Sequence, residues 1–445
     1  MARVAALVFI ALSLCCSAAV SGASLRLSLA DSALSANAER YLVDTRRALH
    51  RIPELGFQET QTSSFLRSAL TNLSVPHISV GHGLMATVGS NSSDSPAVAL
   101  RADMDALPIA EQSSLPPELQ SSHPGLMHAC GHDSHMAMLL GAVRALKQHE
   151  NSLPGTVKAI FSPAEEGGAG AKAMLDAGVF DLPPKPSASF AMHVWPYAGA
   201  PTGTLLSKAG PLMAASGMFE AEVHGTGGHA ALPHRSVDPV PAASACINAL
   251  QTLVSREANP VSGARVVSVS QLNSHGSNAP NVLPSSVTLS GTYRAMSGED
   301  LEFLGKRIRE TIELVSVTYG CNATVDVRAR ERVPYPALIN DGNAMQHAQQ
   351  AATDIFGANN VHETEMQMVA EDYAFFAERI PSAMVLLGVR NESIGATHAL
   401  HSPKFMLDES ALSRGSALHV QIAEQYLRRH SENPQARKDY AHAEL

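Results

Sequence analysis

The sequence predicts an α/β fold with two domains: a larger domain built on a doubly wound, mixed sheet, and a ferredoxin-like domain inserted into it. Short strand patterns alternate with amphipathic helices up to residue 215 and again after residue 332, which favours a mainly parallel sheet covered by helices on both faces. Between these segments the elements follow the order βαββαβ. The 445 residues, 45% hydrophobic and 16% charged, suffice for about two to three packed domains. We expect the larger domain at 36–215 and 332–430, and the inserted domain at 216–331.

Hydrophobic periodicity predicts the elements of the larger domain before the insertion. Apolar residues three and four positions apart indicate helices, and short runs rich in β-branched residues indicate strands. The expected helices are 35–49, 60–70, one that begins with Asp133 or Ser134 as its cap, and a short one that Gly178 ends; the expected strands are 85–88, 97–101, 156–161 and 189–192.

Polar side chains follow three of these strands at the points where the strands end. Asp103, the Glu165–Glu166 pair and His193 each come after a different strand. In open α/β sheets, ligands bind in crevices beyond the carboxyl ends of the strands. We therefore expect these side chains to lie around one site.

A second set of patterns predicts the inserted domain. Its expected elements are strands 218–223, 265–271, 287–294 and 324–328 and helices 242–256 and 299–317. The glycine-rich turn 225–228 is not followed by the lysine of a phosphate-binding loop, and we interpret it as a tight turn that presents His229. After the insertion the expected elements are a helix at 343–356, a strand at 384–387 and a final helix at 409–429.

Residues 128–135 (HACGHDSH) are the densest cluster of candidate metal ligands in the sequence. Cys130 could instead be half of a disulfide, but its neighbours are metal-binding types, and with Cys246 and Cys321 it makes an odd number of cysteines beyond the leader. A Cys130–His132 nucleophile pair is a further alternative. Serine catalysis is disfavoured, because the chain has no Gly-x-Ser-x-Gly elbow.

The candidate site gathers residues that are far apart in the sequence: Cys130, His132, Glu165, Glu166, His193 and His401. Taken alone, a histidine such as His193 among apolar neighbours is more often structural, and a Glu–Glu pair is more often a solvated face. Together, at strand ends and loops, they favour a site for one or two divalent cations with a position open for water. In such a pair, one carboxylate can bind a cation while the other accepts a proton from water.

The charge and the two ends of the chain bear on partners and location. A net charge of −9 without a basic run excludes the electrostatic pattern of nucleic-acid binding, and no segment is long and apolar enough to span a membrane. Residues 1–23 have the pattern of a signal peptide, and the tail 431–445 ends in His-Ala-Glu-Leu, close to retention sequences of the endoplasmic reticulum. The glycosylation sequons are Asn72, Asn91, Asn322 and Asn391. We expect a protein of the endoplasmic reticulum lumen with a small-molecule substrate.

Six motifs make the sequence resemble the di-metal amidohydrolases of the aminoacylase and carboxypeptidase clan. The subfamily it resembles most includes the plant hydrolases of auxin (indole-3-acetic acid)–amino acid conjugates, and the motifs extend over almost all of residues 40–430. They are 101–108 (RADMDALP), 128–135 (HACGHDSH), 163–168 (PAEEGG), 193–196 (HVWP), 227–230 (GGHA) and 401–405 (HSPKF). The chain departs from the family at Ala370, where Ser-Glu-Asp is usual, and this weakens any role for Glu371 and Asp372.

The resemblance implies roles for individual residues. The implied ligands of two divalent cations are Cys130, His132, Glu166, His193 and His401. Glu165 is then the general base, and His229 is the residue that reaches the scissile carbonyl. Arg294 or Asn278 would meet the carboxylate of the substrate's amino acid.

The resemblance also implies a reaction, a metal and an assembly. The reaction is hydrolysis of the amide bond of N-acyl amino acids, with indole-3-acetic acid conjugates as the expected substrates. The alternatives are a general N-acyl-amino-acid deacylase, a hydrolase of another hormone conjugate, and an inactive conjugate-binding protein. Cysteine and histidine ligands favour zinc, whereas the resemblance implies manganese, which we expect here. The inserted domain would act as a lid and as the dimerisation domain of a homodimer.

Overall fold

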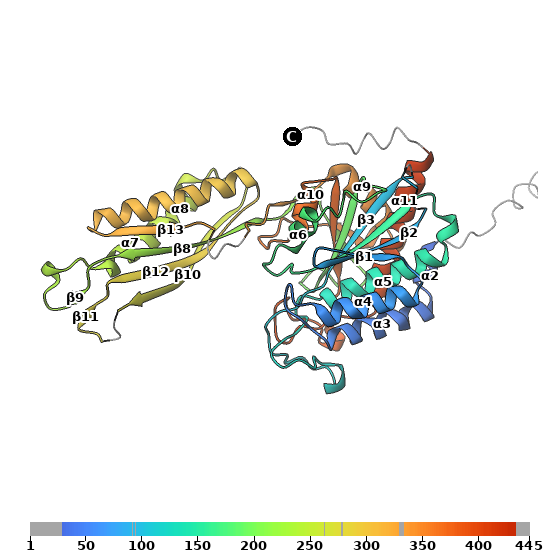
Figure 1. The fold of residues 1–445 in the computed structure, drawn as a ribbon, viewed down its shortest axis with the longest axis horizontal. Helices are drawn as coiled ribbons and strands as arrows, with labels where there is room; N and C mark the ends of the chain where they lie inside the picture. The colour runs from blue at the N-terminus through green and yellow to red at the C-terminus, as the bar shows by residue number, and fades with distance from the viewer. Residues whose placement is uncertain are drawn as a thin grey trace, which may run out of the picture.

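The computed structural model describes residues 29–90, 92–93, 95–261, 263–276, 279–328 and 333–432. The expected signal peptide, the tail beyond residue 432 and the candidate residue Asn278 therefore lie outside the described residues. The described chain forms a larger α/β domain and an elongated second domain that projects from it (Figure 1).

A mixed sheet organises the larger domain, and its order among the described strands is β1-β2-β4-β3-β5-β16-β6-β15. The strands are β1 (His77–Val80), β2 (Gly83–Gly89), β3 (Ala97–Asp103), β4 (Thr156–Ser162), β5 (Ser189–Trp195), β6 (Leu205–Ser207), β15 (Val361–Glu363) and β16 (Ser382–Gly388). The central strands β4, β3, β5 and β16 run parallel, whereas β1 pairs antiparallel with β2 and β2 with β4. The predicted α/β class is confirmed, and the carboxyl ends of β3, β4 and β5 share one edge.

Alternating side chains of the central strands fill two hydrophobic cores, one on each face of the sheet. In β3, Val98 and Leu100 belong to the first core and Ala99 to the second. The helices that contribute to the first core are α2 (Leu29–Ala33), α3 (Ala36–His50), α4 (Thr60–Asn72), α5 (His132–Gln148), α9 (Gly342–Phe356) and α11 (Ala411–Glu432). The second core is covered by α6 (Gly170–Asp176) and α10 (Ala374–Ala377). Helices thus cover both faces, as a doubly wound sheet requires.

Helix α5 begins at His132 because Gly131 takes the N-cap position. Gly131 has a φ of +89°, and no side chain of the described residues caps the helix. The prediction that Asp133 or Ser134 caps it is wrong. Asp133 is buried and lies 2.9 Å from Arg46 Nε and 2.7 Å from His50 Nδ1, so its carboxylate ties α5 to α3.

The inserted domain, called the lid below, is formed from β8 to β13 and has its own hydrophobic core. Its main strands are β8 (Ala215–His224), β10 (Arg265–His275), β12 (Ser286–Ala295) and β13 (Asn322–Asp326), in the antiparallel order β10-β12-β8-β13. Its helices are α7 (Pro239–Thr252), followed by a π-helical turn at Leu253–Glu257, and α8 (Gly298–Thr318). The order along the chain is the ferredoxin-like βαββαβ. Cys246 and Cys321 are buried in this core and, like Cys130, form no disulfide within the part of the chain that the structure describes.

Two short ribbons complete the described lid and its connections. β9 (Gly228–His229) and β11 (Val282–Leu283) pair at the end of the lid that lies away from the larger domain (Figure 1). β7 (Gly210–Met213) and β14 (Leu338–Asn340) pair where the chain approaches and leaves the lid. The lid is therefore held to the larger domain by two neighbouring crossings of the chain.

Candidate metal centre and active-site cavity

Five predicted metal ligands come together at the carboxyl edge of the central strands. They are Cys130 and His132 at the start of α5, Glu166 after β4, His193 in β5 and His401 before α11. Gly131 allows the first two to lie side by side, because its left-handed φ is strained for any other residue. A Cβ atom there would also lie 2.5 Å from Val194 Cγ2. The turn into α5 is therefore built around a glycine.

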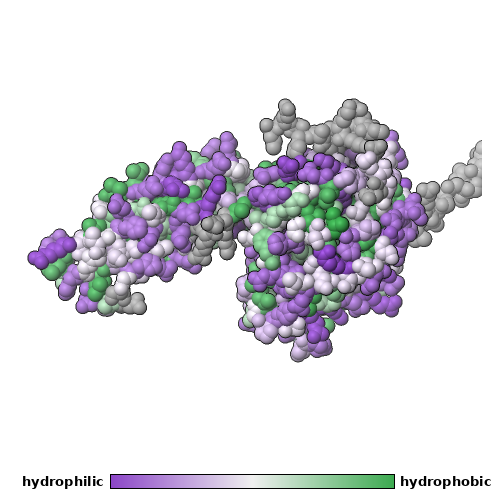
Figure 2. All heavy atoms as spheres, viewed as in Figure 1, coloured by the Kyte–Doolittle hydropathy of each residue, from purple (hydrophilic) through white to green (hydrophobic). Residues whose placement is uncertain are grey.

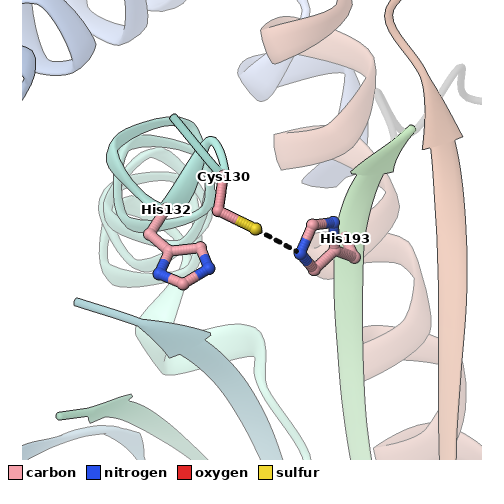
Figure 3. Close-up of side chains that lie close together, drawn as sticks. All are labelled: Cys130, His132 and His193. Carbon is pink, nitrogen blue, oxygen red and sulfur yellow. Dashed lines mark hydrogen bonds between the residues drawn. The ribbon is translucent and has the colours of Figure 1, made fainter. Parts of the chain in front are cut away.

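The donor atoms of these residues form overlapping groups whose members lie within 4.8 Å of one another. One group is Cys130, His132 and His193, and another is Cys130, Glu166 and His401. Figure 3 shows the contact between Cys130 and His193. The distance from Cys130 Sγ to His193 Nε2 is 3.5 Å, and Glu166 Oε1 lies 3.1 Å from His401 Nε2. Since Cys130 belongs to both groups, the five residues form one ligand cluster.

The histidines of the ligand cluster are oriented as metal ligands are. The Nδ1 atoms of His132 and His193 contact backbone carbonyl oxygens at 2.9 and 2.8 Å, which leaves their Nε2 atoms for the cluster. His132 Nε2 is buried and has no hydrogen-bond partner among the described residues. A buried polar atom of this kind is costly unless a ligand satisfies it. The thiol, imidazole and carboxylate donors therefore fit a divalent cation.

Burial and neighbouring charges set the protonation of the ligand cluster. Burial lowers the pKa of His193 well below its usual value, so that the ring is neutral and can bind a cation. Burial raises the pKa of the Cys130 thiol, and the carboxylates of Glu166 and Glu165 raise it further. A thiol of this kind is a poor nucleophile unless a cation stabilises its thiolate. The alternative of a cysteine nucleophile is therefore disfavoured.

Glu165 lies beside the ligand cluster and differs from its neighbour Glu166. Burial raises the pKa of Glu165 well above its usual value, and the Glu371 and Glu166 carboxylates add to this shift. A carboxylate with a raised pKa is a better proton acceptor, as general-base catalysis requires. Burial would also raise the pKa of Glu166, but contact with His401 and attraction to His132 lower it. The pair thus combines a basic carboxylate with one that stays ionised.

One buried arginine, Arg101 of β3, offsets part of this acidic charge. Its guanidinium lies 3.0 Å from the carboxylates of Asp103 and Glu371 and 2.6 Å from that of Asp372. Asp103 contacts His135 Nδ1 at 2.6 Å, and His135 Nε2 accepts a backbone N–H of β5 at 2.9 Å. Both nitrogens of His135 are engaged, so this histidine supports the ligand cluster from outside.

The ligand cluster opens into a cavity of about 780 Å³ that both the larger domain and the lid line. Much of its wall is apolar, with Trp195, Tyr197, Met213, Met218, Met368 and Leu400. The lid also contributes Arg294, whose Nη1 donates to the Met368 carbonyl oxygen at 2.9 Å. Burial lowers the pKa of Arg294, and no acidic neighbour among the described residues offsets this shift. The cavity therefore contains a cation without a carboxylate partner.

His229, a predicted site residue, does not line this cavity. It is exposed on β9, at the end of the lid away from the larger domain (Figure 1). In the space-filling view this end of the lid is strongly hydrophilic at its tip (Figure 2). Asn278 lies outside the described residues, so its predicted role stays a prediction. A single chain in this conformation thus brings together the five ligands, Glu165 and Arg294, but not His229.

The polar residues that line the cavity but are not predicted as site residues from the sequence include Glu371 and Tyr335. For Glu371 a local indication exists, an acidic pair in a largely apolar segment, although the preceding Ala370 departs from the resembled family. Tyr335 lies in a Pro–Tyr–Pro segment that only indicates the return of the chain from the lid. Its hydroxyl bonds a residue 170 positions earlier, and no local pattern indicates such a contact.

Comparisons with known proteins agree with this geometry. Residues 99–425 match the family described as Peptidase family M20/M25/M40. The IAA-amino acid hydrolase ILR1-like 5 of Arabidopsis thaliana is 43% identical over 397 residues, which are 88% of each chain. The N-acetylcysteine deacetylase of Bacillus subtilis (strain 168) is 38% identical over 86% of this chain and 96% of its own. The crystal structure of the Bacillus subtilis YXEP protein, a dinuclear metal-binding peptidase of family M20, matches with a TM-score of 0.72 and 33% identity, over 88% of this chain and 98% of that chain.

Proposed function

Because the chain belongs to Peptidase family M20/M25/M40 and is a metal-dependent hydrolase of amide bonds, we propose that it acts on conjugates of indole-3-acetic acid with amino acids. The observation that carries this proposal is the composition of the cavity. The ligand cluster and Glu165 can act on the amide bond of such a conjugate, and the positive charge of Arg294 can bind the carboxylate of its amino acid. The apolar wall can bind its acyl group. The 43% identity to an IAA-amino acid hydrolase supports the choice of acyl group.

We propose that the ligand cluster holds two divalent cations, and that they are manganese. The proposed ligands are Cys130, His132, Glu166, His193 and His401. Two donor groups that share one thiol support two cations, as does the similarity to a dinuclear peptidase. A bound divalent cation supplies a Lewis acid that polarises the amide carbonyl and lowers the pKa of water. The donors also suit zinc, and metal availability can outweigh the order of affinity.

Glu165 is the proposed proton carrier of the reaction. Its carboxylate accepts a proton from the attacking water and gives it to the nitrogen of the departing amino acid, which regenerates the carboxylate. The Asp372 N–H donates to Glu165 Oε1 at 3.3 Å and holds one carboxylate oxygen in place. The raised pKa of Glu165, caused first by burial, favours the first transfer, in which the carboxylate accepts the proton of water.

The cavity wall suits a flat, apolar acyl group. The rings of Trp195 and Tyr197 lie 4.6 Å apart between centroids, and methionines from both domains line the same cavity. Aromatic rings and polarisable sulfur atoms form favourable contacts with a planar aromatic group such as indole. We assign the carboxylate of the substrate to Arg294, with Asn278 as the alternative partner.

We further propose that the protein is a homodimer and that His229 acts in the cavity of the partner copy. β10, 11 residues long, is an edge strand of the lid sheet. The lid also exposes Leu272, Leu314 and Val317, with exposed fractions of 53%, 66% and 62%. An edge strand and exposed apolar residues form a surface that a second copy can cover. In such a dimer His229, which does not line the cavity of its own chain, can act in the cavity of the partner copy.

We propose that the protein acts in the lumen of the endoplasmic reticulum. The signal-peptide pattern of residues 1–23 and the His-Ala-Glu-Leu ending support this location. The sequons Asn72 and Asn322 are exposed in the described residues, where glycans can be attached. Among the described helices, none combines the length and the apolar character needed to cross a membrane.

A second candidate function is deacylation of small N-acyl amino acids, which the 38% identity to N-acetylcysteine deacetylase favours. A cavity of about 780 Å³ with an aromatic wall is larger than an acetyl group needs, and this favours the indole conjugate. An inactive conjugate-binding protein is disfavoured, because both Glu165 and the ligand cluster are intact.

A substrate panel tests the proposal. Purified protein is stripped with a chelator, reloaded with manganese or zinc, and assayed with indole-acetyl, jasmonoyl, benzoyl and acetyl amino acids. We expect no hydrolysis before reloading, and the highest kcat/KM for an indole-acetyl amino acid with manganese. A preference for acetyl amino acids supports the deacylase instead, and no hydrolysis with any metal supports the binding protein.

Glu165→Gln tests the mechanism within the same panel. The amide keeps the shape of the side chain but cannot accept the proton, so we expect kcat to fall about a thousandfold. Cation binding, measured by competition with a chromogenic chelator, should stay within about threefold of the wild type, since Glu165 is not a proposed ligand. Turnover close to the wild-type value would show that Glu165 is not the general base.

A further inference from the structure

The turn that carries Glu165 and Glu166 is wrapped around the hydroxyl group of Tyr335. The hydroxyl donates to the Glu165 carbonyl oxygen at 2.7 Å, and it accepts from the backbone N–H groups of Gly167 at 3.0 Å and Ala169 at 2.9 Å. Burial raises the pKa of Tyr335, so the hydroxyl keeps its proton and remains a donor. One side chain thus satisfies three backbone groups of this turn.

The backbone of this turn needs support from outside. Ala164 and Ala169 have φ values of +51° and +54°, in a region that residues other than glycine rarely adopt. Asp105 accepts from the backbone N–H groups of both glutamates, at 3.0 and 2.9 Å, and Glu59 accepts from the Ala164 N–H at 2.8 Å. Asp105 and Glu59 both belong to the larger domain. Tyr335, by contrast, supports the turn from the segment that returns from the lid.

The main chain of Tyr335 pairs with Ser216 where the chain crosses between the domains, and this pair of crossings is called the hinge below. Its N–H donates to the Ser216 carbonyl oxygen, and its carbonyl oxygen accepts from the Ser216 N–H, at 3.0 Å in both cases. Ser216 lies in β8, where the chain enters the lid, so the two crossings are joined at this pair. The ring of Tyr335 packs edge-on against Phe375 at a centroid distance of 5.8 Å. One residue therefore joins the hinge to the turn.

We propose that Tyr335 is a positioning residue through which the hinge of the lid sets the backbone of the turn that carries Glu165 and Glu166. The proposal rests on the roles proposed above for the two glutamates. A displacement of the lid that shifts the hinge strand shifts the hydroxyl, and the three hydrogen bonds transmit this shift to the turn. The orientation of the base and of one metal ligand then depends on the position of the lid.

Tyr335→Phe tests the proposal, because it removes the hydroxyl and keeps the ring. We expect kcat to fall about 10- to 100-fold and the affinity for added manganese to fall about tenfold, since loss of a group that orients ligands typically has effects of this size. KM should change less than kcat. The matched control is Tyr293→Phe, which removes a hydroxyl that donates to the Val327 carbonyl oxygen at 2.8 Å within the lid.

Three comparisons decide the result. If Tyr335→Phe equals Tyr293→Phe in kcat and in manganese affinity, the positioning role is overturned. Glu165→Gln is measured in parallel, and wild-type turnover in that variant would overturn the proposed role of Glu165 as the general base. The manganese affinity of Tyr335→Phe would still test the positioning role in that case. Ser216→Pro removes the N–H that bonds the Tyr335 carbonyl oxygen, and its effect on kcat should be smaller when Tyr335 is already phenylalanine. If Ser216→Pro lowers kcat by the same factor in the wild type and in Tyr335→Phe, the two substitutions act independently, and the proposed link between the hinge and the turn is overturned.

Discussion

Glu59 links the stability of the fold to pH through a single buried carboxyl group. Burial raises its pKa to about 7, although the hydrogen bonds that the carboxylate accepts from backbone N–H groups, including that of Ala164, lower the pKa. In the unfolded chain the same group titrates near 4.5. The folded state therefore gains stability from protonated Glu59 below pH 4.5, and this gain is lost as the pH rises through 7.

Glu59→Gln should remove this dependence, because the amide is neutral at every pH and its oxygen can still accept the Ala164 N–H. At pH 8 we expect the variant to be more stable than the wild type by up to about 3 kcal/mol, with a Tm higher by about 2–6 °C. At pH 4 the two proteins should unfold at nearly the same temperature. Thermal unfolding at both values measures the difference, and an equal shift at pH 4 and pH 8 would contradict a titration of Glu59.

The sequence indicates single residues better than it indicates their surroundings. The five ligands stand in local motifs in which thiol, imidazole and carboxylate groups follow strand ends, and these patterns can be recognised without a structure. The acidic pair that contacts Arg101 lies about 270 residues further along the chain, at 371–372. Such ion pairs arise only when the sheet forms, so no sequence pattern predicts them.

At the scale of elements, the start of α5 is the part of the site that depends most on backbone geometry. Gly131→Ala would place a Cβ atom 2.5 Å from Val194 Cγ2 and would force a left-handed φ on alanine. We expect a loss of about 2 kcal/mol or more in the free energy of unfolding. The affinity for manganese should fall at least about tenfold, because the ligands on either side of Gly131 are displaced.

Gly125→Ala is the control for this prediction. Gly125 has a similar φ, +84°, but a Cβ atom there would meet no atom of the described residues within 4 Å. The control should therefore lose about 1 kcal/mol from backbone strain alone and keep its manganese affinity. Denaturant unfolding and chelator competition measure both quantities. Equal manganese affinities in the two variants would mean that the turn at Gly131 does not position the ligands.

The long elements could be predicted from the sequence, whereas the short ones and the element boundaries could not. β3, β4 and β5 are continuous buried runs, and α3 and α8 have clear helical periodicity, so local patterns suffice for them. The three-residue strands β6 and β15 depend on pairing with distant partners. The predicted cap of α5 is wrong, because Asp133 is engaged by an ion pair with Arg46 of α3 that the sequence does not indicate.

For the molecule as a whole, the cavity requires both domains. The larger domain supplies the ligand cluster, and the lid supplies Arg294 and Met218. The arrangement of the two domains therefore sets the distance between the ligand cluster, proposed to act on the amide, and Arg294, proposed to bind the substrate carboxylate. His229 does not fit this scheme within one chain, because it is exposed at the end of the lid away from the larger domain (Figure 1).

Complementation between two inactive variants tests whether His229 acts in the partner copy. Glu165→Gln and His229→Ala are co-expressed with different tags, and the mixed dimer is purified through both. In a mixed dimer, one cavity combines an intact Glu165 with an intact His229 from the other copy, and the second cavity has neither. We therefore expect about half of the wild-type kcat per dimer, although each variant alone is nearly inactive.

The control pairs Glu165→Gln with a chain that carries both substitutions, so that no cavity of the mixed dimer contains an intact Glu165. If His229 instead reaches the cavity of its own chain by bending of the lid, the first mixture must stay as inactive as this control, because its intact Glu165 and intact His229 then lie on different chains. A monomer in sedimentation velocity would exclude the dimer altogether. Recovery of activity therefore requires that two copies associate and that His229 of one copy acts in the cavity of the other.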